Sequence, residues 1–279
     1  AKKLAKKIDG KVNYIFVDIE KKSTNKKDIL TNIERVTKGT IKKSIIKNYK
    51  PNDITVNSIE NFIQDYFRKN LRGVGGKKIL ILGTGNIGSK VAIRLLESGG
   101  NIFLFRRNKK KLKKISEVLN IIKPKHTKSR SNIISSNKLK FEDYDVIIGC
   151  SDNEIKFKKI KNLFKKPLII DVGKGVFTQQ DLNQLNQRNI TVFRLDIENS
   201  LSSFIDTSVD TENFFKGSFI KRKRKFRLVK KGILGNYGDV IVDDVMKPKR
   251  IIGVCDKNGL LKNISLKDYK LLKKEIIRK

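Results

Sequence analysis

A glycine-rich hexapeptide is the part of this 279-residue chain best suited to binding chemistry. It reads Gly83-Thr84-Gly85-Asn86-Ile87-Gly88, directly after the apolar stretch 78–82 and at the start of the helical pattern 87–98. In that setting the first glycine permits a tight turn, the second lets backbone approach a pyrophosphate, and the third lets the helix pack on a strand. Free amides at the helix start attract phosphate oxygens. We therefore expect these six residues to bind a dinucleotide.

The residues after the next apolar stretch, 101–105, bear on the type of dinucleotide. Arg106 and Arg107 follow it, and no acidic residue comes before Glu117. Units that bind NAD usually place an acidic residue here for the ribose hydroxyls, whereas guanidinium groups bind a phosphate in a bidentate manner. Because basic residues are common throughout this chain, the absence of an acidic residue is stronger evidence than the presence of two arginines. We predict NADP(H) as the cofactor.

Polar residues also follow two later apolar stretches, and their position suggests roles beside the cofactor. Ser151 comes after 145–149 and is expected to contact it. Asp171 and Lys174 lie at the end of 168–172 and are candidates for substrate binding or proton transfer. Each is equally compatible with a helix cap or an ordinary surface charge.

Cysteine and histidine usage excludes several other chemistries. Cys150 and Cys255 are far apart and form no CxxC or Cys/His cluster, so we expect neither a disulfide framework nor a metal site. Cys150 is interpreted as a small buried thiol because no histidine stands near it. The single histidine, His126, lies in a polar basic stretch and is interpreted as a solvated loop residue rather than a general base.

Alternation of apolar and amphipathic segments predicts the fold class. Between residues 78 and 193 the pattern is strand then helix, which is typical of a parallel sheet. The expected strands there are 78–82, 101–105, 146–149, 168–172 and 191–193, with helices at 87–98, 109–119, 157–163 and 178–187. In front we expect strands 12–19 and 41–46, a helix over 28–36, a turn at 50–53 and a helix over 56–70. Behind, we expect a loop or hairpin over 217–231, strands 239–246 and 250–255, and a terminal helix 266–277.

We accordingly predict an α/β fold: a doubly wound parallel Rossmann sheet with a small N-terminal α/β domain. The expected divisions are residues 1–76 (small α/β domain, substrate and catalysis), 77–200 (dinucleotide-binding Rossmann domain) and 201–279 (a basic C-terminal extension that completes or packs on the core). Gly73, Gly75 and Gly76 mark the first boundary as a flexible joint.

The formal net charge of +36 raises the question of a polyanionic partner. Lysines are spread over the whole chain, and only Lys221–Arg227 forms a dense cluster, so a dispersed solvated shell is favoured over a nucleic-acid surface. The chain has neither an apolar run long enough to cross a bilayer nor an apolar signal core, which predicts a cytoplasmic protein without membrane contact. The sequence leaves open whether the protein forms a homodimer.

The layout resembles the NAD(P)-dependent dehydrogenases of the shikimate dehydrogenase and methylenetetrahydrofolate dehydrogenase type. Arg106-Arg107-Asn108 is similar to the NADP clamp of the former, and Ile170-Asp171-Val172-Gly173 is like a strand of the latter. The order of the expected elements is similar over residues 50 to 195. The amino-acid sequence itself is similar only in the motifs GTGNIG and IDVG. It implies a Rossmann domain behind a small catalytic domain, with hydride transfer between nicotinamide and a small substrate.

The catalytic apparatus of these families is not carried over with the layout. Asn52-Asp53-Ile54-Thr55 is only loosely similar to the NTD-like motif of shikimate dehydrogenase, and its lysine motif has no counterpart. The Tyr-x-x-x-Lys of the folate enzymes occurs only at Tyr269 and Lys273, and residues 1–76 lack the cysteine that glutamyl-tRNA reductase needs. The turn at Pro51 and the strand that begins at Val12 would both face the cleft. Asp53, Lys21 and Lys22 are therefore candidate catalytic residues.

The sequence thus favours an NADP(H)-dependent oxidoreductase that transfers a hydride between nicotinamide and a small, anionic substrate. Lys174, Asp171 and Asp53 are its candidate catalytic residues. The alternative is a cofactor-binding module, or an inactive homologue, whose basic surface binds nucleic acid or another polyanion.

Overall fold

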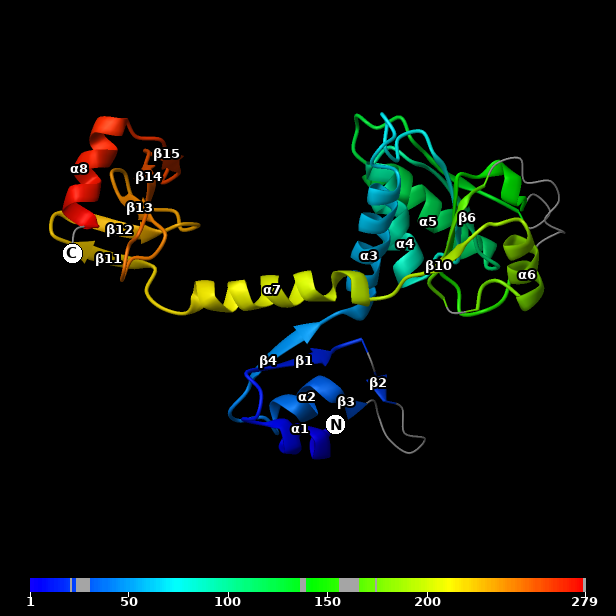
Figure 1. The fold of residues 1–279 in the computed structure, drawn as a ribbon, viewed down its shortest axis with the longest axis horizontal. Coiled ribbons are helices and arrows are strands. Elements are labelled where there is room, and N and C mark those ends of the chain that lie inside the picture. The colour runs from blue at the N-terminus through cyan, green and yellow to red at the C-terminus, as the bar shows by residue number, and fades with distance from the viewer. Residues whose placement is uncertain (21, 24–30, 136–138, 156–165, 174, 278–279) are drawn as a thin grey trace. The chain divides into compact units, whose positions relative to one another are not determined.

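The computed structural model describes residues 1–20, 22–23, 31–135, 139–155, 166–173 and 175–277, and it divides into two compact units (Figure 1). The first is Ala1–Asp206 and the second Thr207–Lys279. The boundaries expected near residues 76 and 200 stay a prediction.

A six-stranded parallel sheet forms the centre of the first unit. Its order is β10-β9-β8-β5-β6-β7, so the chain reverses direction across the sheet between β5 and β8. The strands are β5 (Lys78–Leu82), β6 (Asn101–Phe105), β7 (Ser131–Ile133), β8 (Val146–Gly149), β9 (Leu168–Asp171) and β10 (Val192–Arg194). This is the doubly wound order of a Rossmann sheet, so the predicted fold class is confirmed.

Both faces of this sheet are covered, as the continuous apolar runs of its strands require. Along β5, Ile79 and Ile81 belong to one buried cluster, and Leu80 and Leu82 to another on the opposite face. Among the described residues, four helices accompany the strands: α3 (Pro51–Tyr66), α4 (Asn86–Glu97), α5 (Lys109–Ile122) and α6 (Gln179–Gln187). The helix predicted over 157–163 lies outside the described residues. A short 3₁₀ turn, Phe141–Asp143, precedes β8.

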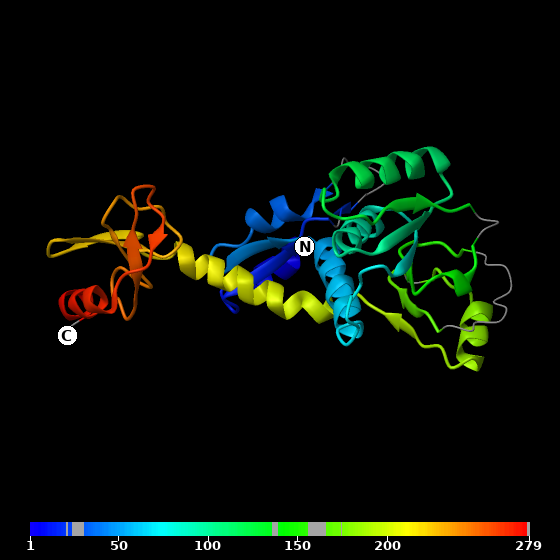
Figure 2. The same cartoon turned by 90° about the horizontal axis from the view of Figure 1, so that it is seen from above.

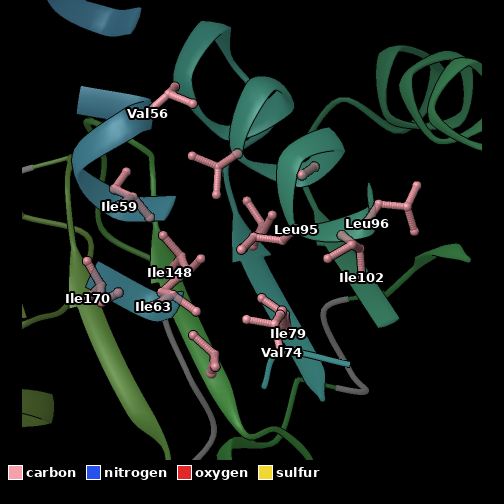
Figure 3. Close-up of a cluster of buried hydrophobic side chains, with 14 of the residues drawn as sticks. Val56, Ile59, Ile63, Val74, Ile79, Leu95, Leu96, Ile102, Ile148 and Ile170 are labelled. Carbon is pink, nitrogen blue, oxygen red and sulfur yellow. The ribbon is translucent and has the colours of Figure 1, made fainter. Parts of the chain in front are cut away.

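Helix α3 packs beside α4 against the sheet. Figure 3 shows Ile59 and Ile63 of α3 gathered with Leu95 of α4 and Ile148 of β8, and each of these four side chains is fully buried. The helix begins at Pro51, where the sequence predicted a turn, and ends at Tyr66 rather than residue 70. Proline is favourable in the first helical turn because the amide it lacks would have no partner there, so the turn signal was wrong.

A two-stranded parallel sheet, β1 (Tyr14–Asp18) with β4 (Ile45–Tyr49), lies at the start of the chain. Around it are α1 (Lys2–Ile8), β2 (Lys22–Ser23), β3 (Thr31–Asn32) and α2 (Ile33–Lys38). The predicted strand 41–46 begins later, at Ile45, because the Asp9 carboxylate accepts hydrogen bonds from the amides of residues 42–44 and bends that segment. The expected helix 28–36 lies partly outside the described residues.

Helix α7 (Glu198–Phe215) runs from the first unit into the second. The second unit holds the hairpin β11 (Ile220–Lys223) and β12 (Phe226–Lys230), then β13 (Val240–Val242), β14 (Ile251–Cys255), β15 (Leu261–Lys262) and α8 (Leu266–Ile276). These five strands form one sheet in chain order, and α8 packs against β14 (Figure 2). The predicted hairpin and terminal helix are both present.

Within the described ranges, none of the helices combines the length and apolar character needed to cross a bilayer.

Candidate dinucleotide-binding site

A cavity of about 350 Å³ lies at the carboxyl ends of β5, β6 and β8. Three loops line it: 83–85 after β5, residues 106–108 after β6, and residues 150–155 after β8. The cavity therefore stands where the strand order reverses, which is the place where open α/β sheets bind their ligands. It brings together Gly83, Thr84, Gly85, Arg106, Arg107 and Ser151, six of the nine residues predicted to bind the cofactor.

The glycines of the loop differ in what a side chain would meet. Gly83 has φ +99°, and a Cβ there would lie 2.8 Å from the carbonyl oxygen of Cys150. A Cβ on Gly88 would lie 1.9 Å from the Gly83 carbonyl oxygen. A Cβ on Gly85 would meet nothing within 4 Å, and φ there is −82°. Gly83 and Gly88 are therefore required by the fold, whereas Gly85 faces open space, where backbone can approach a ligand.

Arg106 and Thr84 link the loops after β5 and β6. Nη1 of Arg106 donates a 2.6 Å hydrogen bond to the carbonyl oxygen of Thr84. The Thr84 hydroxyl is buried and has no hydrogen-bond partner among the described residues. A buried hydroxyl without a partner costs about 1–3 kcal/mol, so a ligand that bonds to it would gain free energy. This unpaired hydroxyl and the open face of Gly85 fit a bound dinucleotide.

The other three predicted residues, Asn86, Ile87 and Gly88, lie in the first turn of helix α4. Asn86 donates from Nδ2 to Oε1 of Glu20 at 3.3 Å, and Ile87 packs against the buried cluster beneath α4. With Gly88, they contribute backbone amides and packing, and they do not line the cavity.

The loops after β8 and β9 lie close together. Asp171 accepts from the amide of Gly175 at 3.2 Å through Oδ2, while its buried Oδ1 has no partner among the described residues. Lys174 lies outside them, so its predicted role rests on sequence alone. Burial, and secondarily the charge of Asp171, raise the pKa of the Cys150 thiol to about 12. The thiol therefore stays protonated at neutral pH, as expected for a residue that is not a nucleophile.

Sequence reasoning missed a polar cluster beside the glycine loop. Asp53, in the first turn of α3, forms an ion pair with Lys90 of α4. Glu20 bridges the same two helices: its Oε2 accepts from the amide of Asn52 at 2.8 Å and its Oε1 from Asn86. Asp53 was a candidate, but Lys90 is one of 64 Lys and Arg residues, and only the packing of α3 on α4 distinguishes it.

The basic cluster 221–227 is partly neutralised within its own unit. Lys223 donates to the carbonyl oxygen of Ile276, Arg224 pairs with Glu275, and Arg227 pairs with Asp239, each at 2.6 Å. This reduces the charge available to a polyanion. In the part of the chain that the structure describes, no group of three or more His, Cys, Asp or Glu could hold a metal ion.

Sheet order, glycine loop and cavity together define a Rossmann-type nucleotide-binding domain. Residues 78–175 match the family model "NADP oxidoreductase coenzyme F420-dependent". The predicted resemblance to NAD(P)-dependent enzymes is thereby confirmed for this domain, and the match supports a pyridine-nucleotide-dependent oxidoreductase.

Individual proteins match parts of the chain as well. Glutamyl-tRNA reductase from Flavobacterium psychrophilum is 30% identical over 147 residues, which are 52% of this chain but only 33% of that protein. Among solved structures, a dipicolinate synthase chain from Bacillus halodurans is 16% identical (74% of this chain, 80% of that chain, TM-score 0.41). Shikimate dehydrogenase from Aquifex aeolicus is 18% identical (61% and 57%, TM-score 0.37).

Proposed function

We propose that this chain is an NADP(H)-dependent oxidoreductase acting on a small, anionic substrate. The observation that carries the proposal is the cavity at the carboxyl ends of β5, β6 and β8, with an open glycine face on one side and two arginines on another. Backbone at Gly85 would face the pyrophosphate, Arg106 and Arg107 the ribose 2′-phosphate, and Ser151 the nicotinamide half. The bound nicotinamide would accept or release a hydride.

Proton transfer needs a side chain that reaches the substrate, and we assign this role to Lys90, which lies in the first turns of α4 after the glycine loop. The side chains of Lys90 and Asp53 are 41% and 45% exposed, so both are accessible from solvent. The Asp53 carboxylate orients the ammonium group through the ion pair. Lys90 would thus stabilise negative charge on a substrate oxygen or donate a proton to it, close to the start of α4.

Asp171 and Lys174 remain the second set of candidates. Asp171 stands at the end of β9, and one of its carboxylate oxygens is buried without a described partner, which suits a hydrogen bond to a ligand amide. Asp53 and Lys90 lie at the start of the helices and Asp171 lies at a strand end, so substitutions test the two sets separately.

A parallel titration with NADPH and NADH at about 0.15 M salt, where long-range charge effects are screened, tests the cofactor. We expect a thermal shift with NADPH and a smaller one with NADH. Turnover is then sought with small hydroxy- and oxo-acids by absorbance of the reduced nicotinamide. Failure of both dinucleotides to bind would overturn the proposal. Sedimentation of the same sample tests the homodimer.

A further inference from the structure

An apolar groove of about 300 Å³ lies between α4 and α5. Ile93 of α4 lines it, together with Ile115, Val118 and Ile122 of α5. The side chains of Val118 and Ile122 are 51% and 56% exposed, and that of the neighbouring Ile121 is 79% exposed. Three exposed branched aliphatic side chains within five positions of one helix mark this groove as an interaction surface.

Lysines border the groove on the α5 side. Lys114 lines it, and none of the described residues that line it is acidic. Lys111 stands one turn before Ile115 and therefore lies on the same side of α5. The one acidic residue of α5, Glu117, lies 4.0 Å from Nζ of Lys113 and does not line the groove. The groove therefore fits a partner that pairs apolar residues with carboxylates.

Helix α7 has this complementary composition. It contains no Lys or Arg, and it carries the largest excess of acidic residues among the described helices: Glu198, Asp206, Asp210 and Glu212. Ile205 and Val209 stand one turn apart, and each directly precedes an aspartate, so an apolar row runs beside an acidic one. Within the described part of the chain, Asp206 and Asp210 form no ion pair, and only Ser200 of this helix is buried.

The contact of α7 with the small sheet involves another side of the helix. The Phe204 ring packs against Phe16 of β1 and Tyr49 of β4, with centroids 6.0 and 6.3 Å apart. At about 100° per residue, Ile205 and Val209 are turned roughly 100° to 140° from Phe204 around the helix. Neither belongs to a buried cluster of the described residues. The apolar row is therefore accessible to a partner.

We propose that the chain forms a symmetric dimer in which α7 of each copy lies in the α4–α5 groove of the other. The apolar row of α7 covers Val118 and Ile122, and Asp206 and Asp210 face the lysines that border the groove. A two-fold axis makes the contact twice, so each chain gives one helix and receives one. A second copy is favoured over another acidic partner because the chain itself supplies the complementary helix.

The length of α7 suits this arrangement. Its 18 residues make a helix about 27 Å long, whereas the 14 residues of α5 make one of about 21 Å. The helix of one copy can thus follow the groove of the other over its whole length.

Charge reversal on each side of the contact tests the dimer. The variant K111E/K114E reverses the border of the groove, and D206K/D210K reverses the acidic row of α7. Lys90, which also lines the groove, is left unchanged because the proposed reaction uses it. Circular dichroism checks that each variant folds as the wild type does.

Helix α8 supplies a matched control. Lys267 and Lys270 are exposed and stand three residues apart, as Lys111 and Lys114 do. In sedimentation equilibrium of the full chain at about 0.15 M salt, we expect the wild type and K267E/K270E to dimerise with affinities within about threefold of each other. Each interface variant should dimerise about tenfold or more weakly, because repulsion replaces attraction at two equivalent contacts.

Mixing the two interface variants gives the sharpest result. In a dimer of one K111E/K114E chain and one D206K/D210K chain, the glutamate groove meets the lysine helix and the lysine groove meets the aspartate helix. The mixture should therefore associate within about threefold of the wild-type affinity. A mixture that does not associate would overturn the reciprocal exchange of α7.

Two further outcomes would also overturn the inference. A wild type that stays monomeric up to about 0.1 mM would leave the groove to the same chain or to another protein. A wild-type dimer that neither reversal weakens would mean that the copies meet elsewhere. Dinucleotide binding is measured separately, so neither outcome bears on the proposed function.

Discussion

Substituting Gly85 separates what the ligand requires from what the fold requires. A Cβ at this position meets nothing within 4 Å, and the backbone has negative φ, so Gly85→Ala introduces neither a clash nor a strained conformation. Gly85 is also the N-cap of α4, where alanine is worse than glycine by up to about 1 kcal/mol. The lower entropy of the unfolded chain returns about 0.4–1 kcal/mol. The free energy of unfolding should therefore change by less than about 1 kcal/mol.

Gly88 is the matched control because it lies three residues away in the same loop. A Cβ there would stand 1.9 Å from the carbonyl oxygen of Gly83 and 3.2 Å from Cβ of Cys150, so backbone must move. Overpacking of this kind costs about 1–3 kcal/mol or more. We expect Gly88→Ala to lower the urea midpoint clearly and Gly85→Ala to leave it almost unchanged.

Although Gly85→Ala should leave folding stability almost unchanged, it should strongly weaken ligand binding. At 100 times the dissociation constant, a ligand stabilises its protein by about 2.7 kcal/mol, which a thermal shift detects. We expect NADPH to give this shift in the wild type and to lose at least about 100-fold in affinity for Gly85→Ala, with Gly85→Val weaker still. Wild-type affinity in a folded Gly85→Val would refute the reasoning, because the pyrophosphate could not then lie against this backbone. Loss of folding in Gly85→Ala would refute the packing argument.

The remaining predictions concern the charges and the thiol around the cavity. Replacing Arg106 and Arg107 with glutamine should weaken NADPH binding about tenfold or more beyond any effect on NADH, and equal losses would mark them as ordinary surface charges. Lys90→Gln should lower turnover by about 10²–10⁴-fold with little change in NADPH affinity, and Asp53→Asn should add little to it in the double variant; additive losses would contradict a coupled pair. The folded-state pKa of the Cys150 thiol is raised to about 12 from 9.0, so its protonated form is favoured by folding and stability should fall as pH rises from 9 toward 12. Cys150→Ala should remove that part of the decline in urea titrations, and an identical pH profile in both proteins would contradict the assignment.

Local chemistry explains which elements were predictable. The stretch 78–82 is apolar on both faces and is followed at once by GTGNIG, so strand, turn and helix are all encoded within about 20 residues. Strand β7 was not predicted because Ser131-Asn132-Ile133 is short and lacks apolar alternation. Its parallel backbone pairing with β6 holds it in the sheet. Helix α7 was missed because its apolar residues are sparse and, among those described, only Ser200 is buried.

Contacts between residues far apart in the sequence explain the features that the sequence pattern did not predict. Asp9 bends residues 42–44 from more than 30 positions away, which no pattern within 41–46 reveals. Arg106 and Arg107 follow a recognisable strand and could be assigned a role by position alone. Lys90 could not, because its partner Asp53 is 37 residues earlier and the pair depends on the packing of two helices.

The packing of α3 on α4 also relates the glycine loop to the proposed proton-transfer pair. Asn52 and Asp53 begin α3, and Asn86 and Lys90 lie in the first turns of α4, so the two bonds of Glu20 and the ion pair join the helices at their amino ends. Further along, Arg94 lies near Glu60, which is what two helices running in the same direction would give. The buried contacts of Ile59 and Ile63 hold that alignment, so a substitution such as Ile59→Ala should displace Asp53 from Lys90 as well as cost about 2–5 kcal/mol. The helix pair thus positions a lysine next to the loop that would hold the dinucleotide, and the geometry of the proposed reaction depends on core residues that touch neither ligand.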